Sequence, residues 1–214
     1  MRRNGAWGSG NRMLRVGLTG GLASGKTNVG QALESMGCYL IQADQLGRKV
    51  LEPGGPAYAS VLKEFGTGIL EEDGSINRRE LAAQVFANPD RLSVLNSLVH
   101  PHVIELEGKL LAEYERREPH GIGIVEAAIL IETGSFKRFD KLILVMCSQE
   151  QQLERAMKRD GLSYEEVQAR LERQMPLEEK RQYADYVIDT SGSKEETLAQ
   201  TREVYNSLRS LIQK

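Results

Sequence analysis

The amino-acid sequence predicts an α/β fold: a central parallel five-stranded sheet flanked by helices and interrupted by two helical insertions. Short apolar segments alternate with longer amphipathic ones, which is the pattern of a parallel sheet covered on both faces. The first apolar segment, around Val16 and Leu18, leads directly into the glycine-rich sequence 20–27 and then into a helical pattern. The chain therefore opens with a strand, a loop and a helix.

The remaining strands are predicted from short apolar runs between polar segments. The segments 122–125 and 142–146 are apolar enough for central strands that are buried on both faces. Shorter runs at 39–42 and 186–189 complete the predicted sheet of five strands.

Two helices of the core have recognisable patterns. The first is predicted over 26–36, where Gly37 is placed to cap its C-terminus. The last, over 194–213, has the spacing of an amphipathic helix that closes the domain.

Two helical insertions separate these core elements, one over about 44–119 and a charge-rich one over about 149–183. Their helix starts follow known N-terminal patterns: Asn77-x-x-Glu80, Asn88-Pro89 and the capping box Ser163-x-x-Glu166. The core of the domain is then formed by about 13–43, 120–148 and 184–214.

Composition excludes several classes of protein. A formal net charge of −2 on 214 residues provides no basic footprint for nucleic acid, and no apolar run approaches the roughly 20 residues of a membrane span. Cys38 and Cys147 lie far apart in apolar surroundings, as reduced core cysteines do. Residues 1–12 lack the apolar segment of a signal peptide and are predicted to be a flexible extension before one domain at 13–214. The sequence gives no prediction of oligomeric state.

A complete phosphate-binding sequence follows the first strand, in the strand-to-helix context that it requires. Its glycines allow tight turns, positive φ and close approach to oxygen atoms, and its amides form a nest for an anion at a helix N-terminus. Lys26 is expected to reach the β and γ phosphates, and the Thr27 hydroxyl to ligate Mg²⁺. The predicted nucleotide-binding residues of this loop are Gly20, Gly21, Leu22, Ala23, Ser24, Gly25, Lys26 and Thr27.

A phosphate loop does not by itself distinguish a kinase from a GTPase or an ATP-driven motor. The guanine-recognition sequence Asn-Lys-x-Asp does not occur, and the formal GTPase-switch match Asp44-Gln-Leu-Gly47 begins only 17 residues after Thr27. No long apolar strand ends in Asp-Glu, which argues against a motor ATPase. These observations favour a small-molecule kinase of the P-loop kinase fold, with a helical domain for the acceptor and a lid over the donor.

Four arginines lie in the predicted lid: Arg155 and Arg159 share one helix face, and Arg170 and Arg173 follow on the next helix. Phosphoryl transfer needs positive charge on the oxygens of the moving group, and arginines on a closing segment supply it. We assign Arg155 to nucleotide binding and Arg159, with Lys26, to catalysis. For any single arginine, a solvated surface stripe is the alternative.

Asp44 directly follows the second predicted strand, which places it at the carboxyl edge of the sheet, where open α/β folds bind ligands. There it could accept the proton of an acceptor hydroxyl. Equally, it could be the N-cap of a helix over 45–51. The residues alone leave both roles open.

From Met13 onward a series of further motifs follows in a fixed order. They are 18–27, Ala43-Asp-Gln-Leu-Gly-Arg48, Gly74-Ser-Ile-Asn-Arg-Arg-Glu-Leu81, 85–89, Leu98-Val-His-Pro101, Gln152-Leu-Glu-Arg155, Arg159-Asp160, Arg170 with Gln174, and Ala184-Asp-Tyr-Val-Ile-Asp189 with Gly192. In this order they resemble the dephospho-coenzyme A kinase family. The resemblance implies that ATP and Mg²⁺ are used in the cytoplasm to phosphorylate the ribose 3′-hydroxyl of dephospho-CoA, the final step of coenzyme A synthesis.

The resemblance also implies roles for individual residues. It makes Asp44 the catalytic base and the first insertion a CoA-binding domain, whose substrate-binding residues are Asp44, Arg48, Arg78 and His100. It places Asp189 and Gly192 near the adenine of ATP. For His100, a position at a helix N-terminus ahead of Pro101 is the alternative.

The chain departs from the family pattern at three positions. Gln42 stands where the family often has an aspartate that could assist metal binding. Glu126 and Ala128 replace the aspartate and proline that often follow the third strand, which could shift the fit of the acceptor. A different small-molecule kinase and a nucleotide-binding regulatory protein without turnover are therefore the alternatives; the complete phosphate loop and Asp44 argue against the second.

Overall fold

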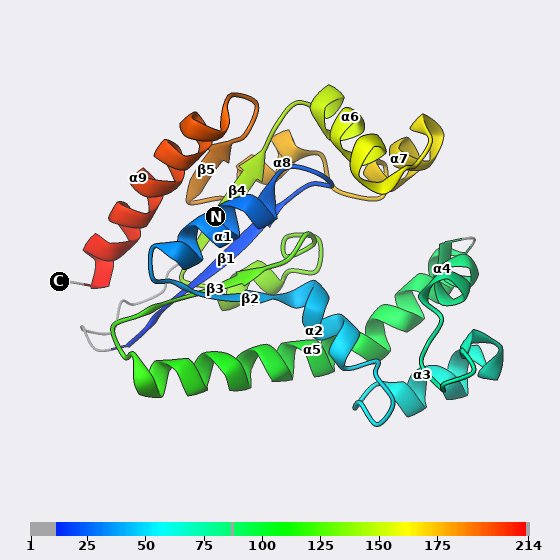
Figure 1. The fold of residues 1–214 in the computed structure, drawn as a ribbon. Coiled ribbons are helices and arrows are strands. Elements are labelled where there is room, and N and C mark those ends of the chain that lie inside the picture. Colours follow the sequence, from blue (N-terminus) through cyan, green and yellow to red (C-terminus); the bar gives the residue numbers. More distant parts are fainter. Residues whose placement is uncertain (1–11, 87, 213–214) are drawn as a thin grey trace. The chain divides into compact units, whose positions relative to one another are not determined.

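The computed structural model of the protein describes residues 12–86 and 88–212 (Figure 1). The predicted extension over 1–12 lies outside the described residues except for Arg12, whose guanidinium pairs with Asp140. Two compact units divide the chain: one consists of the residues up to Ile41 together with Glu113–Lys214, and the other is Gln42–Ala112.

Five strands form one sheet in the order β2-β3-β1-β4-β5 (Figure 1). They are β1 (Leu14–Gly20), β2 (Tyr39–Gln42), β3 (Ile122–Glu126), β4 (Lys141–Met146) and β5 (Tyr186–Asp189). Strand β1 pairs in parallel with β3 and β4, and β4 pairs in parallel with β5. The predicted five-stranded parallel sheet is confirmed, and the four strands whose ends were predicted lie within one residue of those ends.

The core of the sheet-containing unit is an apolar cluster shared by the strands and two helices, α1 (Lys26–Ser35) and α9 (Lys194–Ile212). Val16 and Ile143 from the strands, Leu33 from α1 and Leu208 from α9 are fully buried in it. Burial of this apolar surface holds both helices on the sheet, and α1 thereby fixes the direction in which the phosphate loop leaves β1.

The other helices follow in chain order. They are α2 (Ala43–Lys49), α3 (Tyr58–Phe65), η1 (Thr67–Ile69), α4 (Arg78–Phe86), α5 (Pro89–Arg117), η2 (Ser135–Arg138), α6 (Gln149–Asp160), α7 (Tyr164–Leu171) and α8 (Leu177–Arg181). The 42–112 unit has its own apolar cluster around Val61, Phe65 and Leu81. None of the helices in the described part of the chain is both long and apolar enough to cross a membrane.

The predicted helix ends are confirmed by their hydrogen bonds. The Asn77 and Asn88 side chains accept from the amides of Glu80 and Asp90, at 3.0 and 2.9 Å, where α4 and α5 begin. Ser163 and Glu166 form a capping box at α7. Beyond α1, Gly37 has a φ of 99° and its amide bonds to the Glu34 carbonyl, as expected of a glycine that ends a helix.

Two sequence-based alternatives are wrong. Asp44 is not an N-cap, because α2 begins one residue earlier, at Ala43, and its N-cap is Gln42. His100 does not start a helix, because α5 continues through Pro101. The apolar residues Leu98 and Val99 pack on the cluster of the 42–112 unit just before the proline, so tertiary packing outweighs the backbone hydrogen bond that proline cannot make.

Cys38 and Cys147 are free and buried, as predicted. Burial raises the pKa of the Cys38 thiol to about 12 and also raises the pKa of Cys147. Both side chains therefore act as small apolar groups at neutral pH.

Candidate active site

A pocket of about 880 Å³ lies in the sheet-containing unit, beside the phosphate loop. Four segments line it: the loop with α1, one face of α6, the turn after β5, and one face of α9. The lining residues include Ala23, Ser24, Gly25, Lys26, Thr27 and Asn28 from the loop and α1, Arg155, Lys158 and Arg159 from α6, Thr190, Gly192 and Ser193 from the turn, and Lys194, Thr197, Leu198 and Thr201 from α9. The residues of the first turn of α1 are part of this lining.

The backbone of the phosphate loop is left-handed at two positions. Gly25, the N-cap of α1, has a φ of 87°, and no side chain of the described residues caps the helix there. Ala23 has a φ of 52°, the one positive value at a non-glycine residue within the described ranges. The N-terminus of α1 thus lines the pocket, where the helix dipole favours an anion such as a phosphate.

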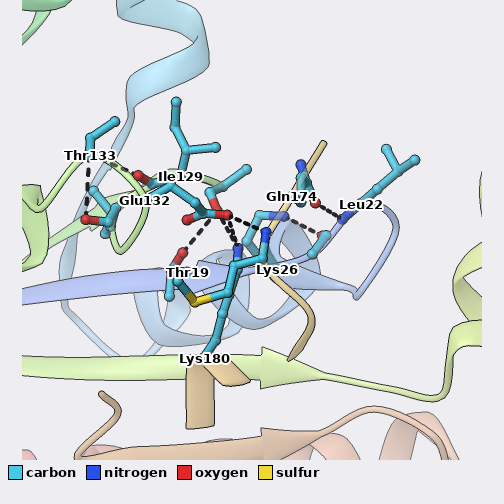
Figure 2. Close-up of polar contacts among 12 residues, drawn as sticks. Thr19, Leu22, Lys26, Ile129, Glu132, Thr133, Gln174 and Lys180 are labelled. Carbon is cyan, nitrogen blue, oxygen red and sulfur yellow. Dashed lines mark hydrogen bonds and ion pairs between the residues drawn. The ribbon is translucent and has the colours of Figure 1, made fainter. Parts of the chain in front are cut away.

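Lys26 and Thr27 both point their polar atoms at backbone or carboxylate oxygens of neighbouring segments. The Lys26 ammonium donates to the carbonyl of Gly21 at 2.8 Å (Figure 2). The Thr27 hydroxyl donates to Oε1 of Glu126 at 2.9 Å. Glu126 is 8% exposed and is the last residue of β3, paired in register with Leu18 of β1.

The Thr27–Glu126 pair fits a magnesium ion. A hydroxyl and a carboxylate are hard oxygen donors of the kind that Mg²⁺ prefers beside the phosphates of a nucleotide. In the sequence, Glu126 stands out only as a departure from the family pattern. Its position at the carboxyl end of a buried strand that neighbours β1 is the signal that could have identified it.

The first three residues of the loop do not line the pocket. A Cβ on Gly20 would lie 2.4 Å from the carbonyl oxygen of Val145, and a Cβ on Gly21 would lie 2.3 Å from Nε2 of Gln152. Close approach to neighbouring protein atoms therefore requires glycine at both positions. The amide of Leu22 donates to Oε1 of Gln174 at 2.9 Å.

The predicted lid arginines divide into two pairs. Arg155 and Arg159 line the pocket, whereas Arg170 and Arg173 do not. Arg155 donates to the hydroxyl and carbonyl of Thr190, at 3.0 and 2.7 Å, and so joins α6 to the turn after β5. Lys158, which the sequence analysis did not select, is a third cation of α6 on this wall.

Arg159 makes a two-pronged contact with the adjacent Asp160, with Nε–Oδ1 and Nη2–Oδ2 distances of 2.7 and 2.9 Å. This guanidinium lowers the pKa of the Asp160 carboxyl. Arg159 is more than half exposed, which leaves it room to exchange this partner for a ligand oxygen.

The turn after β5 separates two residues that were predicted to lie near adenine. Gly192 lines the pocket, but Asp189 does not. The Asp189 carboxylate instead accepts from the amide of Ser191 at 2.8 Å and shapes the turn. Thr190 fixes the turn to the phosphate loop, because its hydroxyl donates to the carbonyl of Ser24 at 2.9 Å.

The predicted acceptor residues belong to the 42–112 unit. Asp44 lies in the first turn of α2, Arg48 in its last turn, and Arg78 is the first residue of α4. His100 is half-buried in α5, and this burial lowers the pKa of its imidazole, which is therefore neutral at pH 7.

Comparisons with known proteins agree with this geometry. A family model described as dephospho-CoA kinase matches residues 14–196. The dephospho-CoA kinase of Aquifex aeolicus strain VF5 is 43% identical over 199 residues, which cover 92% of this chain and 98% of the relative.

Solved structures support the same fold. The crystal structure of TT1252 from Thermus thermophilus has a TM-score of 0.77 and 33% identity, covering 92% of this chain and 97% of the other. The dephospho-CoA kinase from Campylobacter jejuni has a TM-score of 0.61 at 24% identity, covering 91% of this chain and 96% of the other. The predicted P-loop kinase fold is confirmed.

Proposed function

The chain belongs to the dephospho-CoA kinase family, and from that premise we propose that it transfers the γ-phosphoryl group of ATP to the ribose 3′-hydroxyl of dephospho-CoA. The products are coenzyme A and ADP, and the reaction is the final step of coenzyme A synthesis in the cytoplasm. The observation that supports the proposal most strongly is the phosphate-loop pocket, in a chain whose family match spans 14–196.

The phosphate loop and the lid helix α6 bind the nucleotide. Backbone amides at the start of α1 and the Lys26 ammonium hold the β and γ phosphates, and Arg155 holds the turn that borders the pocket. Thr27 and Glu126 are the residues that would hold Mg²⁺. When bound, this ion supplies positive charge that neutralises the β and γ phosphate oxygens.

Asp44 acts as the general base of the transfer. It accepts the proton of the 3′-hydroxyl while the hydroxyl oxygen forms a bond to the γ-phosphorus. The bond between that phosphorus and the β,γ-bridging oxygen breaks, and ADP leaves with the electron pair. Arg159 exchanges Asp160 for the equatorial oxygens of the moving group and stabilises their charge.

The acceptor is recognised by cations of the 42–112 unit. Arg48 and Arg78 bind phosphates of dephospho-CoA, because guanidinium groups match phosphate oxygens in pairs. A neutral His100 contributes a hydrogen bond and no charge.

The proposal is tested by ADP release from MgATP, measured alone and with dephospho-CoA, AMP or adenosine as acceptor. We expect strong stimulation by dephospho-CoA and none by the other two. Stimulation by AMP or adenosine would indicate a different small-molecule kinase. Nucleotide binding without stimulation by any acceptor would indicate a regulatory protein.

A further inference from the structure

Two glutamines of the lid segment 149–183, one before and one after α7, hold one residue of the phosphate loop. Gln152 of α6 donates from Nε2 to the carbonyl of Leu22 at 2.7 Å. Gln174, between α7 and α8, accepts at Oε1 from the amide of Leu22 at 2.9 Å (Figure 2). We propose that Gln152 and Gln174 are positioning residues for phosphoryl transfer, which fix the phosphate loop in its nucleotide-binding conformation. The inference deepens the proposed function, because it concerns the same phosphate-loop site.

The environment of Gln152 shows that its contact is built into the fold. Gln152 is only 5% exposed, although half of the α6 residues are charged. A buried amide is destabilising unless it is hydrogen-bonded, and the Leu22 carbonyl provides that bond. The side chain lies so close to Gly21 that a Cβ there would be 2.3 Å from Nε2. The contact of Gln152 with the loop therefore requires a glycine at position 21.

The backbone next to Leu22 is strained. Ala23 follows it with a φ of 52°, a left-handed conformation that costs a non-glycine residue free energy and persists only where neighbouring contacts impose it. The preceding peptide is held from both sides, because Lys26 donates to the carbonyl of Gly21 while Gln174 accepts from the amide of Leu22. The two glutamines thus complete the set of contacts that impose this turn.

The chain that follows Gln174 is held by contacts that do not involve Leu22. The backbone from which Gln174 reaches Leu22 is therefore fixed. Its neighbour Met175 donates its amide to Oε1 of Glu132 at 3.2 Å. The same oxygen is 2.8 Å from the ammonium of Lys180, whose side chain is fully buried. Lys180 also donates to the carbonyl of Ala128 at 3.0 Å. Figure 2 labels Glu132, Lys180 and Gln174.

A loop that is already in its bound conformation loses less conformational entropy when it binds a nucleotide. The glutamine contacts should therefore appear in nucleotide affinity. They also tie the phosphate loop to α6, the helix that carries Arg155 and Arg159 towards the pocket. Loss of either contact is expected to weaken ADP and ATP binding before it affects the folding of the domain.

The same isosteric change has opposite consequences at the two positions. Gln174→Glu keeps an acceptor for the Leu22 amide, whereas Gln174→Leu removes it. Gln152→Glu replaces the donor with a carboxylate that faces the Leu22 carbonyl, and two acceptors repel each other. Gln182→Glu is the matched control, because the side chain of the exposed Gln182 donates to the carbonyl of Glu179, within its own segment.

The test measures ADP affinity by calorimetry for the four variants and the parent chain. We expect Gln152→Glu and Gln174→Leu to raise the Kd for ADP by about tenfold or more, and Gln174→Glu and Gln182→Glu to stay within about threefold. With dephospho-CoA turnover, KM for ATP should rise in the first two variants while KM for the acceptor stays the same.

Equal effects of Gln152→Glu and Gln174→Glu would overturn the inference, as would a lower thermal midpoint with unchanged ADP affinity. If Gln152→Glu does not fold, the pair Gln174→Leu and Gln174→Glu decides the question alone. ADP binding needs no acceptor. A failure of this inference is therefore distinguishable from a failure of the proposed dephospho-CoA kinase activity.

Discussion

The hydroxyl of Thr27 donates a hydrogen bond to the carboxylate of Glu126, with 2.9 Å between Oγ1 and Oε1. This contact joins the end of the phosphate loop to the end of β3 and brings together two oxygen donors from segments about a hundred residues apart in the chain. It is the feature of the pocket that most clearly suits a divalent cation beside a triphosphate.

Glu126→Gln tests this pairing. The amide keeps the shape of the side chain and an acceptor for Thr27 but removes the negative charge. We expect the Mg²⁺ concentration for half-maximal turnover to rise by about tenfold, while affinity for metal-free ADP is retained. Titration of ADP binding with and without Mg²⁺ checks this. Glu118→Gln, at an exposed position, is the control, and an unchanged Mg²⁺ requirement would argue against a metal role for Glu126.

Asp44→Asn removes the proposed base. Turnover is expected to fall by about a hundredfold or more, the usual scale for a lost general base, with ADP affinity nearly unchanged. Steady-state kinetics and ADP calorimetry measure the two effects. Asp90→Asn is a matched control, because Asp90 is also in the first turn of a helix of the same unit. Turnover of Asp44→Asn close to that of the parent chain would remove Asp44 from the mechanism.

Arg159→Ala separates the two pairs of lid arginines. Arg159 lines the pocket and Arg173 does not, so kcat should fall by at least about tenfold for Arg159→Ala and stay near the parent value for Arg173→Ala. The same substitution removes the partner that lowers the pKa of Asp160, so this pKa should rise towards its usual range. Comparable losses of kcat in both variants would mean that the lid arginines contribute only through their overall positive charge and that Arg159 has no particular role.

Lys180→Met probes the anchor of the lid exit. Removing the buried ammonium leaves Glu132 without its ionic partner, and Glu132 and the Ala128 carbonyl keep the Met175 amide and the Thr19 hydroxyl, respectively, as donors. We expect the free energy of unfolding to fall by about 3 kcal/mol. Urea denaturation measures it. The neighbouring Arg181→Met breaks an exposed pair with Glu178 and should cost less than about 1 kcal/mol. Equal losses of unfolding free energy in the two variants would contradict the expectation that the buried ion pair of Lys180 contributes more than the exposed pair of Arg181.

The sheet and the helix ends could be predicted because their signals are local. Each strand is a short apolar run, and the capping residues Asn77, Asn88 and Ser163 lie within three residues of the amides that they satisfy. The continuation of α5 through Pro101 could not be read locally, because packing of the residues before the proline decides it.

The polar contacts of the site depend on partners that are distant in the chain. Gln152 and Gln174 are 130 and 152 residues from Leu22, so the sequence shows them only as members of a motif. Glu126 likewise meets Thr27 only because β3 and β1 are neighbours in the sheet. From the phosphate loop and α6, the sequence selected residues that line the pocket, among them Lys26, Thr27 and Arg159. The atoms that hold these residues in place could be identified only from the folded structure.

The most direct test of the central claim is phosphorus NMR of the product formed from MgATP and dephospho-CoA. We predict one new phosphomonoester signal, identical to that of the 3′-phosphate of authentic coenzyme A, appearing together with ADP. A phosphate at another hydroxyl, or ADP formed without a phosphorylated acceptor, would contradict the proposed reaction.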